Sequence, residues 1–274
     1  MRLPKSDLHT HTVFCDGKGT PEATVLEAIA RGYHTIGISG HAYTPFDTSF
    51  CMTDEAGYFA ELRRLEALYA DRISLQIGLE IDALGGGRPF EVDYVIGSVH
   101  YFDTPSGRFD VDRSPEELLR ALSLGYGGNE HAMIDAYFAS VVDGCDRLRP
   151  EIVGHFDLLT KFEEMGSPIN TRSEYYYGAA CDALAATVRV APRLEINSGA
   201  VARGYRSEAY PSDRLISAAL ELGARFILTS DAHTPGNVGY AFERSAERLL
   251  ALGCTSVDVR FGDAFLEHSL LPND

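Results

Sequence analysis

Two histidines separated by one residue lie near the start of the sequence, in the stretch Asp7-Leu8-His9-Thr10-His11. Alternate residues of an extended strand share one face, so we expect Asp7, His9 and His11 to point the same way. Two neutral imidazoles supply only part of the coordination sphere of a divalent ion. The pattern therefore predicts a metal site whose remaining ligands come from later in the chain.

Further metal-binding side chains occur where short apolar runs end. The histidines at or directly after such ends are His9, His11, His41, His100 and His233, a sixth (His155) lies inside a run, and the carboxylates in equivalent places are Glu80, Glu195 and Asp231. A single histidine at a strand end is usually an ordinary hydrogen-bonded residue, but so many together indicate a multinuclear metal site. Imidazole and carboxylate ligands suit Zn, Mn or Fe, and a carboxylate such as Glu80 can bridge two ions.

The apolar runs alternate with helical patterns along the chain. The predicted strands cover residues 6–11, 35–39, 74–80, 93–100, 151–157, 193–198 and 225–230, with a further β-like run at 256–261. The predicted helices cover residues 20–32, 55–69, 115–124, 131–147, 174–190, 212–222 and 240–252. This alternation implies a parallel sheet covered by helices, and ligands repeated at strand C-termini imply a closed barrel rather than an open sheet.

We expect residues 1–274 to form a single α/β domain, a barrel with one strand fewer than the usual eight. The segment from about residue 103 to 150 is long for one crossover. It is predicted to be an insertion that either shapes access to the site or extends the structure.

Composition narrows the classes of function. The formal net charge of -16 argues against binding to long nucleic acids, although metal ions in a cleft would still allow a small phosphorylated substrate. Five scattered cysteines without a CxxC pair indicate a reducing compartment. There is no apolar run long enough for a membrane span, and the opening residues do not resemble a secretory signal. We therefore expect a cytoplasmic protein that does not bind membranes; the sequence does not predict its oligomeric state.

Several short motifs are spread over nearly the whole chain. They are Asp7-Leu8-His9-Thr10-His11-Thr12, Ser39-Gly40-His41, Gly78-Leu79-Glu80, Gly97-Ser98-Val99-His100, Gly154-His155-Phe156-Asp157 and Ser230-Asp231-Ala232-His233. Together they resemble the PHP (polymerase and histidinol phosphatase) superfamily. Longer strings resemble its histidinol-phosphate phosphatases more narrowly: Phe14-Cys15-Asp16-Gly17-Lys18, Gly97-Ser98-Val99-His100-Tyr101, Glu195-Ile196-Asn197-Ser198-Gly199 and Arg203-Gly204-Tyr205-Arg206.

The resemblance implies a distorted TIM-like (β/α)7 barrel with a trinuclear metal site at the C-terminal ends of its strands. It implies three sets of ligands: His9, His11, Glu80 and Asp231 for the first ion, Glu80, His100 and His155 for the second, and His41 and His233 for the third. Members of the family often carry another histidine shortly after the first pair, where this sequence has Asp16. We expect Asp16 to take its place at the third ion.

Other polar residues are expected to support this site. Asp7 is predicted to orient a ligand histidine rather than to bind metal itself. Glu195 is predicted either to hydrogen bond to the ligands or the substrate or to coordinate a metal ion. Arg203, Arg206 and Lys161 are candidates for binding the substrate phosphate, because cationic side chains provide strong donors to phosphate oxygens.

The primary hypothesis is a metal-dependent phosphomonoesterase that converts L-histidinol phosphate and water to L-histidinol and phosphate, in histidine biosynthesis. Water activated between the ions would attack phosphorus in line with the leaving alkoxide. Glu80 would bridge the ions, and Asp231 or His233 would move protons.

Three alternatives remain open from sequence. A PHP-type nuclease or phosphoesterase acting on a mononucleotide or another small phosphate ester would use the same metals. An amidohydrolase also begins with two histidines on a barrel strand, but its usual bridging lysine is not evident here. A non-catalytic metal-binding protein is disfavoured by the nearly complete ligand set.

Overall fold

Seven parallel strands form one sheet in the computed structural model, which describes residues 1–89 and 92–272. In spatial order they are β1 (Ser6–Asp7), β2 (Thr35–Ile38), β3 (Ser74–Asp82), β4 (Tyr94–Ser98), β7 (Ile152–Val153), β8 (Arg193–Asn197) and β9 (Arg225–Thr229). Every neighbouring pair is parallel. The predicted seven-stranded α/β architecture is confirmed.

The first and last strands meet just beyond their ends, and this contact closes the sheet into a barrel. Thr10 and Ala232 form a parallel bridge. The His11 amide donates to the Ala232 carbonyl at 2.9 Å, and the Ala232 amide donates to the His9 carbonyl at 3.1 Å. The closure therefore lies among the residues that the sequence predicts to be metal ligands.

The predicted first strand, residues 6–11, is wrong in length, because its regular pairing with β2 ends at Asp7. Beyond that point one backbone hydrogen bond remains, from the Ser39 amide to the Thr10 carbonyl at 3.0 Å, and side chains supply the others. The Tyr94 hydroxyl donates to the Leu8 carbonyl, the Thr10 hydroxyl donates to the Gly37 carbonyl at 2.8 Å, and the Thr10 amide donates to the Ser39 hydroxyl at 3.3 Å. The chain is free to bend here and still satisfies its buried polar groups.

The interior of the barrel is filled around one aromatic ring. The buried apolar side chains inside it are Leu8, Tyr94, Ile96, Ile152 and Ile227. A Cβ atom at Gly37 would lie 2.1 Å from the Tyr94 hydroxyl oxygen, and one at Gly78 would lie 2.3 Å from the ring. Both strands therefore need glycine where the ring crosses them.

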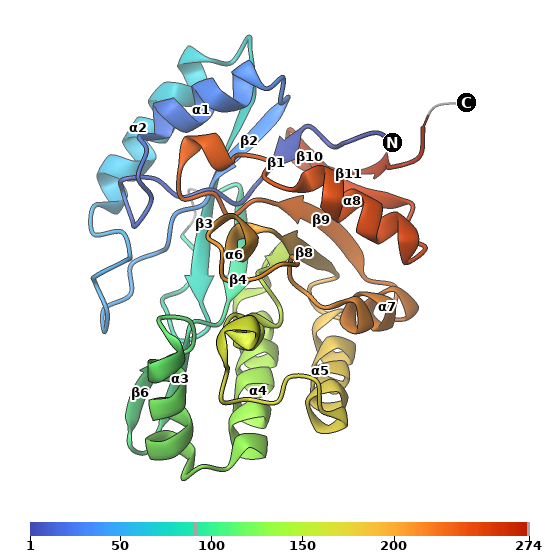
Figure 1. Ribbon diagram of the computed structural model, residues 1–274. Coiled ribbons are helices and arrows are strands. Elements are labelled where there is room, and N and C mark those ends of the chain that lie inside the picture. The colour runs from blue at the N-terminus through green and yellow to red at the C-terminus, as the bar shows by residue number, and fades with distance from the viewer. Residues whose placement is uncertain (90–91, 273–274) are drawn as a thin grey trace.

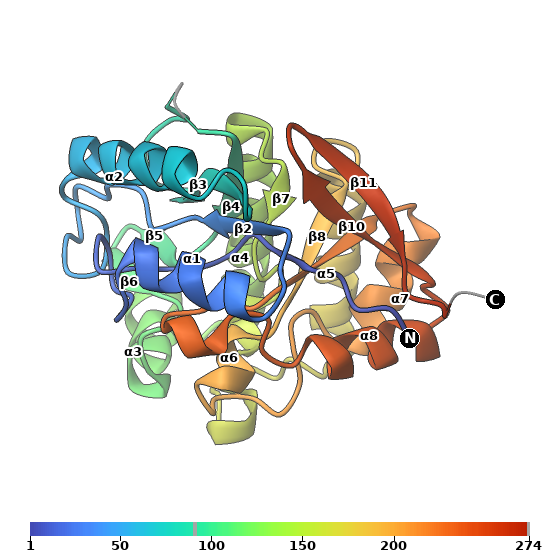
Figure 2. The ribbon, with the colours of Figure 1, turned by 90° about the horizontal axis from the view of Figure 1, so that it is seen from above.

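Helices surround the sheet, as Figures 1 and 2 show from two directions. The longer ones are α1 (Pro21–Ala30), α2 (Glu55–Leu68), α4 (Glu130–Leu148), α5 (Glu174–Thr187), α7 (Asp213–Glu221) and α8 (Phe242–Ala251). The short ones are α6 (Gly199–Ala202), η2 (Leu158–Thr160), η3 (Glu163–Met165) and η4 (Pro235–Asn237). The predicted start of α1 is confirmed, since the Thr20 hydroxyl accepts from the Ala23 amide at 3.2 Å. Among the described residues, no helix is long and apolar enough to cross a membrane.

The long connection between β4 and β7 contains a small hairpin that the sequence analysis did not predict. Its parts are β5 (Tyr101–Thr104), β6 (Gly107–Asp110), α3 (Pro115–Arg120) and the π-helical turn η1 (Ala121–Gly125), followed by α4. α4 packs on β4 and α5 and is the ordinary crossover helix. The additional part of the predicted insertion is thus the segment before α4, which lies at one end of the barrel (Figure 1).

A second hairpin covers the opposite end of the barrel. It consists of β10 (Ser256–Phe261) and β11 (Ala264–Ser269). Asp258 accepts hydrogen bonds from Arg193 and Arg225, which begin β8 and β9, and Arg260 donates to Gln76 near the start of β3. The N-terminal ends of the strands are therefore covered, while the C-terminal ends are left for a site.

Candidate metal centre

Four side chains from three distant parts of the chain converge at the C-terminal ends of β1, β3 and β9. The His9 Nε2 atom lies 3.2 Å from Glu80 Oε2 and 3.8 Å from Asp231 Oδ1. The His11 Nε2 atom lies 3.5 Å and 3.2 Å from the same two oxygens. This is the set predicted for the first ion.

Three of these buried atoms, His9 Nε2, His11 Nε2 and Asp231 Oδ1, make no hydrogen bond to any residue that the structure describes. Buried polar atoms are normally hydrogen bonded, so three orphans facing a common point need another partner. Two imidazole nitrogens and two carboxylates are donors that zinc, manganese and iron accept. The donor set therefore fits a divalent metal ion.

The two oxygens of Glu80 face different groups of histidines. Its Oε1 lies 3.0 Å from His155 Nε2 and 3.3 Å from His100 Nε2, whereas Oε2 faces His9, His11 and His41. Burial opposes ionisation of this carboxyl, but the nearby imidazoles, His9 first, hold its pKa well below the usual range. A carboxylate with an oxygen toward each group has the geometry of a bridge between two ions.

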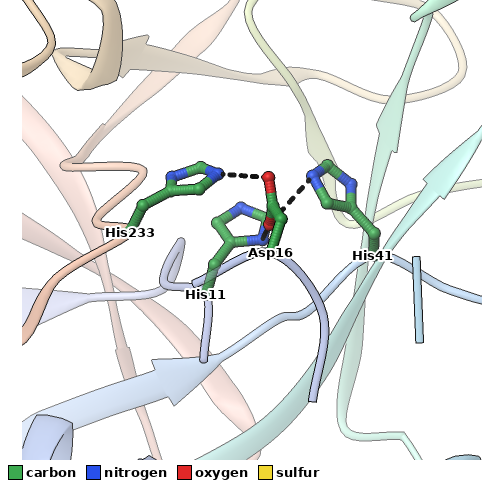
Figure 3. Close-up of side chains that lie close together, drawn as sticks. All are labelled: His11, Asp16, His41 and His233. Carbon is green, nitrogen blue, oxygen red and sulfur yellow. Dashed lines mark hydrogen bonds and ion pairs between the residues drawn. The ribbon is translucent and has the colours of Figure 1, made fainter. Parts of the chain in front are cut away.

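A third group contains His11, Asp16, His41 and His233, and Figure 3 shows Asp16 between the three rings. Asp16 Oδ2 lies 3.0 Å from His233 Nε2, and Asp16 Oδ1 lies 3.7 Å from His41 Nε2 and from His11 Nδ1. Because His11 Nε2 already faces Glu80 and Asp231, the donors left for a separate ion are Asp16, His41 and His233. The Asp16 side chain is 32% exposed, so this group is the most open of the three.

The backbone at Asp231 is held in an uncommon conformation. Its φ of 47° lies in the left-handed region, which costs free energy for residues other than glycine. A Cβ atom on Gly199, at the start of α6, would lie 2.5 Å from Asp231 Oδ2. The sequence Asn197-Ser198-Gly199 thus leaves room for the carboxylate to turn toward His9 and His11.

Glu195 hydrogen bonds to two of the candidate ligand histidines, which is one of the two roles expected for it. Its Oε2 lies 2.8 Å from His9 Nδ1, and its Oε1 accepts from the His155 amide at 2.6 Å. Since an ionised carboxylate can only accept, the proton of a neutral His9 ring belongs on Nδ1, which leaves the Nε2 lone pair for a metal ion.

Asp7 acts on the backbone rather than on a ring, which differs from its predicted role. Its carboxylate accepts from the amides of His9 at 3.3 Å, Ser230 at 3.2 Å and Gly239 at 2.9 Å, and from the Ser230 hydroxyl. Burial raises the pKa of Asp7 despite these hydrogen bonds. Asp7 therefore ties the chain after β1 to the loop after β9, the same junction that closes the barrel.

Of the three cationic candidates, Arg203 alone contacts the candidate metal ligands. It donates to Asp231 Oδ2 at 3.0 Å and lies 2.7 Å from His233 Nδ1. Lys161 lines the same cavity but is bound to Asp112. Arg206 bonds the Thr160 carbonyl and lines a separate cavity beside α5 and α7, so its predicted place at the metal site is wrong.

A cavity of about 330 Å³ opens onto the clustered ligands. Besides the ligands, Arg203 and Lys161, its lining includes Phe50, Tyr101, Asp110, Asp112 and Arg113. The last four come from the unpredicted hairpin and the turn after it. Together these side chains leave room for a small organic molecule beside the ligand cluster.

Sequence reasoning missed two residues that support the ligands. Asp82 accepts from the His100 amide at 2.7 Å, and Ser98 donates to Glu80 Oε1 at 2.6 Å. Each stands two residues from a ligand on the same strand, Asp82 after Glu80 and Ser98 before His100, so the two-residue alternation of a strand was an available signal. Asp112, which lines the cavity, was also missed, and no local sequence pattern marks it.

Comparison with known proteins agrees with this geometry. The sequence model of the PHP domain family matches residues 7–198. Proteins named "Probable histidinol-phosphatase" are 30% identical in Schizosaccharomyces pombe, over 91% of this chain and 87% of the relative, and 30% identical in Deinococcus radiodurans, over 93% and 96%. The fold is shared with histidinol phosphate phosphatase from Lactococcus lactis, crystallised with Zn, L-histidinol and phosphate, with a TM-score of 0.69 at 21% identity over 95% of this chain and 98% of that one. The chain therefore belongs to the PHP domain family and, within it, to the histidinol-phosphatases.

Proposed function

We propose that this protein is a metal-dependent phosphomonoesterase that hydrolyses L-histidinol phosphate to L-histidinol and phosphate, a step of histidine biosynthesis. The observation that carries the proposal is the set of orphaned buried donors, His9 Nε2, His11 Nε2 and Asp231 Oδ1, beside the two-sided carboxylate of Glu80. The histidinol-phosphatase relatives support the substrate. The five unpaired cysteines suit a cytoplasmic location.

Two or three divalent ions are part of this proposal. The proposed ligands are His9, His11, Glu80 and Asp231 for the first ion, Glu80, His100 and His155 for the second, and Asp16, His41 and His233 for the third. Zn is favoured by the Lactococcus lactis complex, and Mn or Fe would accept the same donors. Such ions, when bound, make water a better nucleophile at neutral pH and offset charge on phosphoryl oxygens.

The remaining roles fall to side chains of this protein. Arg203 reaches the ligand cluster with a planar guanidinium and would bind phosphoryl oxygens with two parallel hydrogen bonds. Asp231 or His233 would hold the proton that the leaving alkoxide needs. Glu195 would keep the His9 ring in the tautomer suited to metal binding.

The test is a phosphate-release assay on protein with measured metal content. The substrates are L-histidinol phosphate, other amino-alcohol phosphates, a mononucleotide and a nuclease substrate. We expect the highest kcat/KM for L-histidinol phosphate. A preference for the mononucleotide by more than about tenfold would overturn the substrate while leaving the reaction class intact.

A further inference from the structure

The hairpin inserted after β4 brings carboxylates into the wall of the metal cavity. Asp110 ends β6 and Asp112 follows it, and both line the cavity. Between them, the Val111 amide donates to the His100 carbonyl at 2.8 Å. This hydrogen bond fixes the segment directly beside one of the metal-ligand residues.

Asp112 is held in place by a buried ammonium group. Lys161 Nζ donates to the Asp112 carbonyl at 2.7 Å and to its Oδ2 at 2.8 Å, and the Lys161 side chain is 8% exposed. Burial disfavours the charged form of Asp112, but Lys161 holds its pKa below the usual range. Lys161 was predicted to bind the substrate phosphate. Its position is instead suited to holding the Asp112 carboxylate in place.

Two cations contact the carboxylates beside this wall. Arg113 is shared between Asp47, at 2.8 Å, and Asp110, at 3.0 Å, while Lys161 serves Asp112. Of the three carboxylates, Asp110 and Asp112 line the cavity and Asp47 does not. The two lining carboxylates are acceptors that a cationic group of a bound molecule could use.

Aromatic rings provide a second, independent indication of what the cavity holds. Phe50 and Tyr101 line it with ring centroids 5.9 Å apart, and Phe50 meets the His41 ring edge-on at 4.9 Å. Aromatic faces attract flat rings and organic cations. L-Histidinol phosphate carries a phosphate at one end and an ammonium group with an imidazole at the other, so its non-phosphate end matches this wall.

We propose that Asp112, with Asp110 beside it, binds the cationic end of the substrate and makes this enzyme selective for phosphomonoesters of amino alcohols. This inference rests on the proposed function. Asp112 is a specificity-determining residue in this scheme, Lys161 is the residue that positions it, and the phosphate end is left to the metal-ligand cluster and Arg203.

The test compares two substrates in Asp112→Asn, L-histidinol phosphate and 4-nitrophenyl phosphate, which has no cationic group. We expect the ratio of kcat/KM for the two esters to fall by about tenfold or more, chiefly through KM for L-histidinol phosphate. Asp103→Asn is the matched control, because Asp103 lies in the same hairpin with a side chain 54% exposed and paired with Arg108. It should leave the ratio unchanged.

Product inhibition distinguishes a role of Asp112 in binding the substrate from a purely structural role. Inhibition by L-histidinol should weaken in Asp112→Asn, whereas inhibition by inorganic phosphate should not. Equal losses on both esters, or an unchanged ratio with unchanged inhibition by L-histidinol, would overturn the inference while leaving the proposed function standing. If Asp112→Asn does not fold, Asp110→Asn is measured by the same criteria. A wild-type enzyme without preference for L-histidinol phosphate would overturn both proposals.

Discussion

The orientation of individual rings decides whether the clustered side chains can bind metal. His9 presents Nε2 to the cluster because its Nδ1 lies 2.8 Å from Glu195, a residue 186 positions away in the sequence. Sequence spacing identified His9 and Glu195 as members of the site. It did not identify which nitrogen faces the metals, because that choice depends on a partner brought close only by the folded barrel.

Replacing Glu195 by Gln tests this orientation. The amide keeps the shape of the side chain but loses the charge that favours a proton on His9 Nδ1. We expect metal affinity, measured by competition with a chelator, to fall by about 10- to 100-fold. Glu151→Gln is a suitable control, since Glu151 also bonds a strand amide, that of Val95, but lies outside the ligand cluster. Unchanged metal affinity in Glu195→Gln would show that the charge of Glu195 is not needed to orient the ring.

Asp110 makes the stability of the protein depend on pH. Burial, and then the nearby charge of Asp112, raises the pKa of Asp110 from 3.8 to about 6. The native carboxyl therefore binds its proton more tightly than the unfolded one, so this group lowers the free energy of unfolding as pH rises from about 4 to about 6. Above that window the loss is complete and constant.

Asp110→Asn removes this titration. Thermal unfolding should show the Tm of the variant, relative to wild type, rising by a few degrees between about pH 4 and pH 7. The exposed Asp103→Asn should show no such trend. A difference in Tm that is independent of pH, or that falls as pH rises, would contradict the raised pKa.

At the scale of secondary structure, the elements with strong periodicity were predictable. Five of the seven barrel strands and the main helices occur close to their predicted ranges, because burial on both faces of a parallel strand leaves a continuous apolar run. The strands predicted at residues 6–11 and 151–157 are only two residues long in the structure, Ser6–Asp7 and Ile152–Val153. The β5–β6 hairpin escaped prediction, since its strands have only four residues each and its polar residues do not alternate clearly. The hairpin lies at the start of a segment that the sequence marks only as unusually long for one crossover.

The ends of elements were less predictable than their existence. Sequence pattern extended the first strand to residue 11, whereas hydrogen bonds from the Tyr94 hydroxyl and from the side chain of Thr10 end its regular pairing at Asp7. Tyr94 is 86 residues from Leu8 in the sequence, and Gly37 is 27 residues from Thr10, so neither hydrogen bond could be read from the local pattern. His9 and His11 follow this point, at the C-terminal end of the barrel.

At the scale of the whole molecule, the proposed metal ions join the beginning and the end of the chain. His9 and His11 follow β1, Glu80 lies near the end of β3, and Asp231 follows β9. The bridge between Thr10 and Ala232 closes the barrel at the same place. Without ions, two buried carboxylates and several buried orphan atoms remain at this closure. Bound metal should therefore stabilise the folded state as a whole, since the unfolded chain lacks the assembled site.

Removal of metal tests this coupling. A site filled at about 100 times its Kd contributes about 2.7 kcal/mol, so calorimetry should show the chelator-treated protein unfolding roughly 5 °C or more below the zinc-reconstituted protein. In Glu80→Ala most of this metal-dependent shift should be lost, together with activity and with the two ions that Glu80 would bridge. Glu66→Ala, on the exposed surface of α2, should keep it. A Glu80→Ala protein that retains full metal content and the full shift would show that the carboxylate is not the bridge, whatever the absolute Tm of the variant.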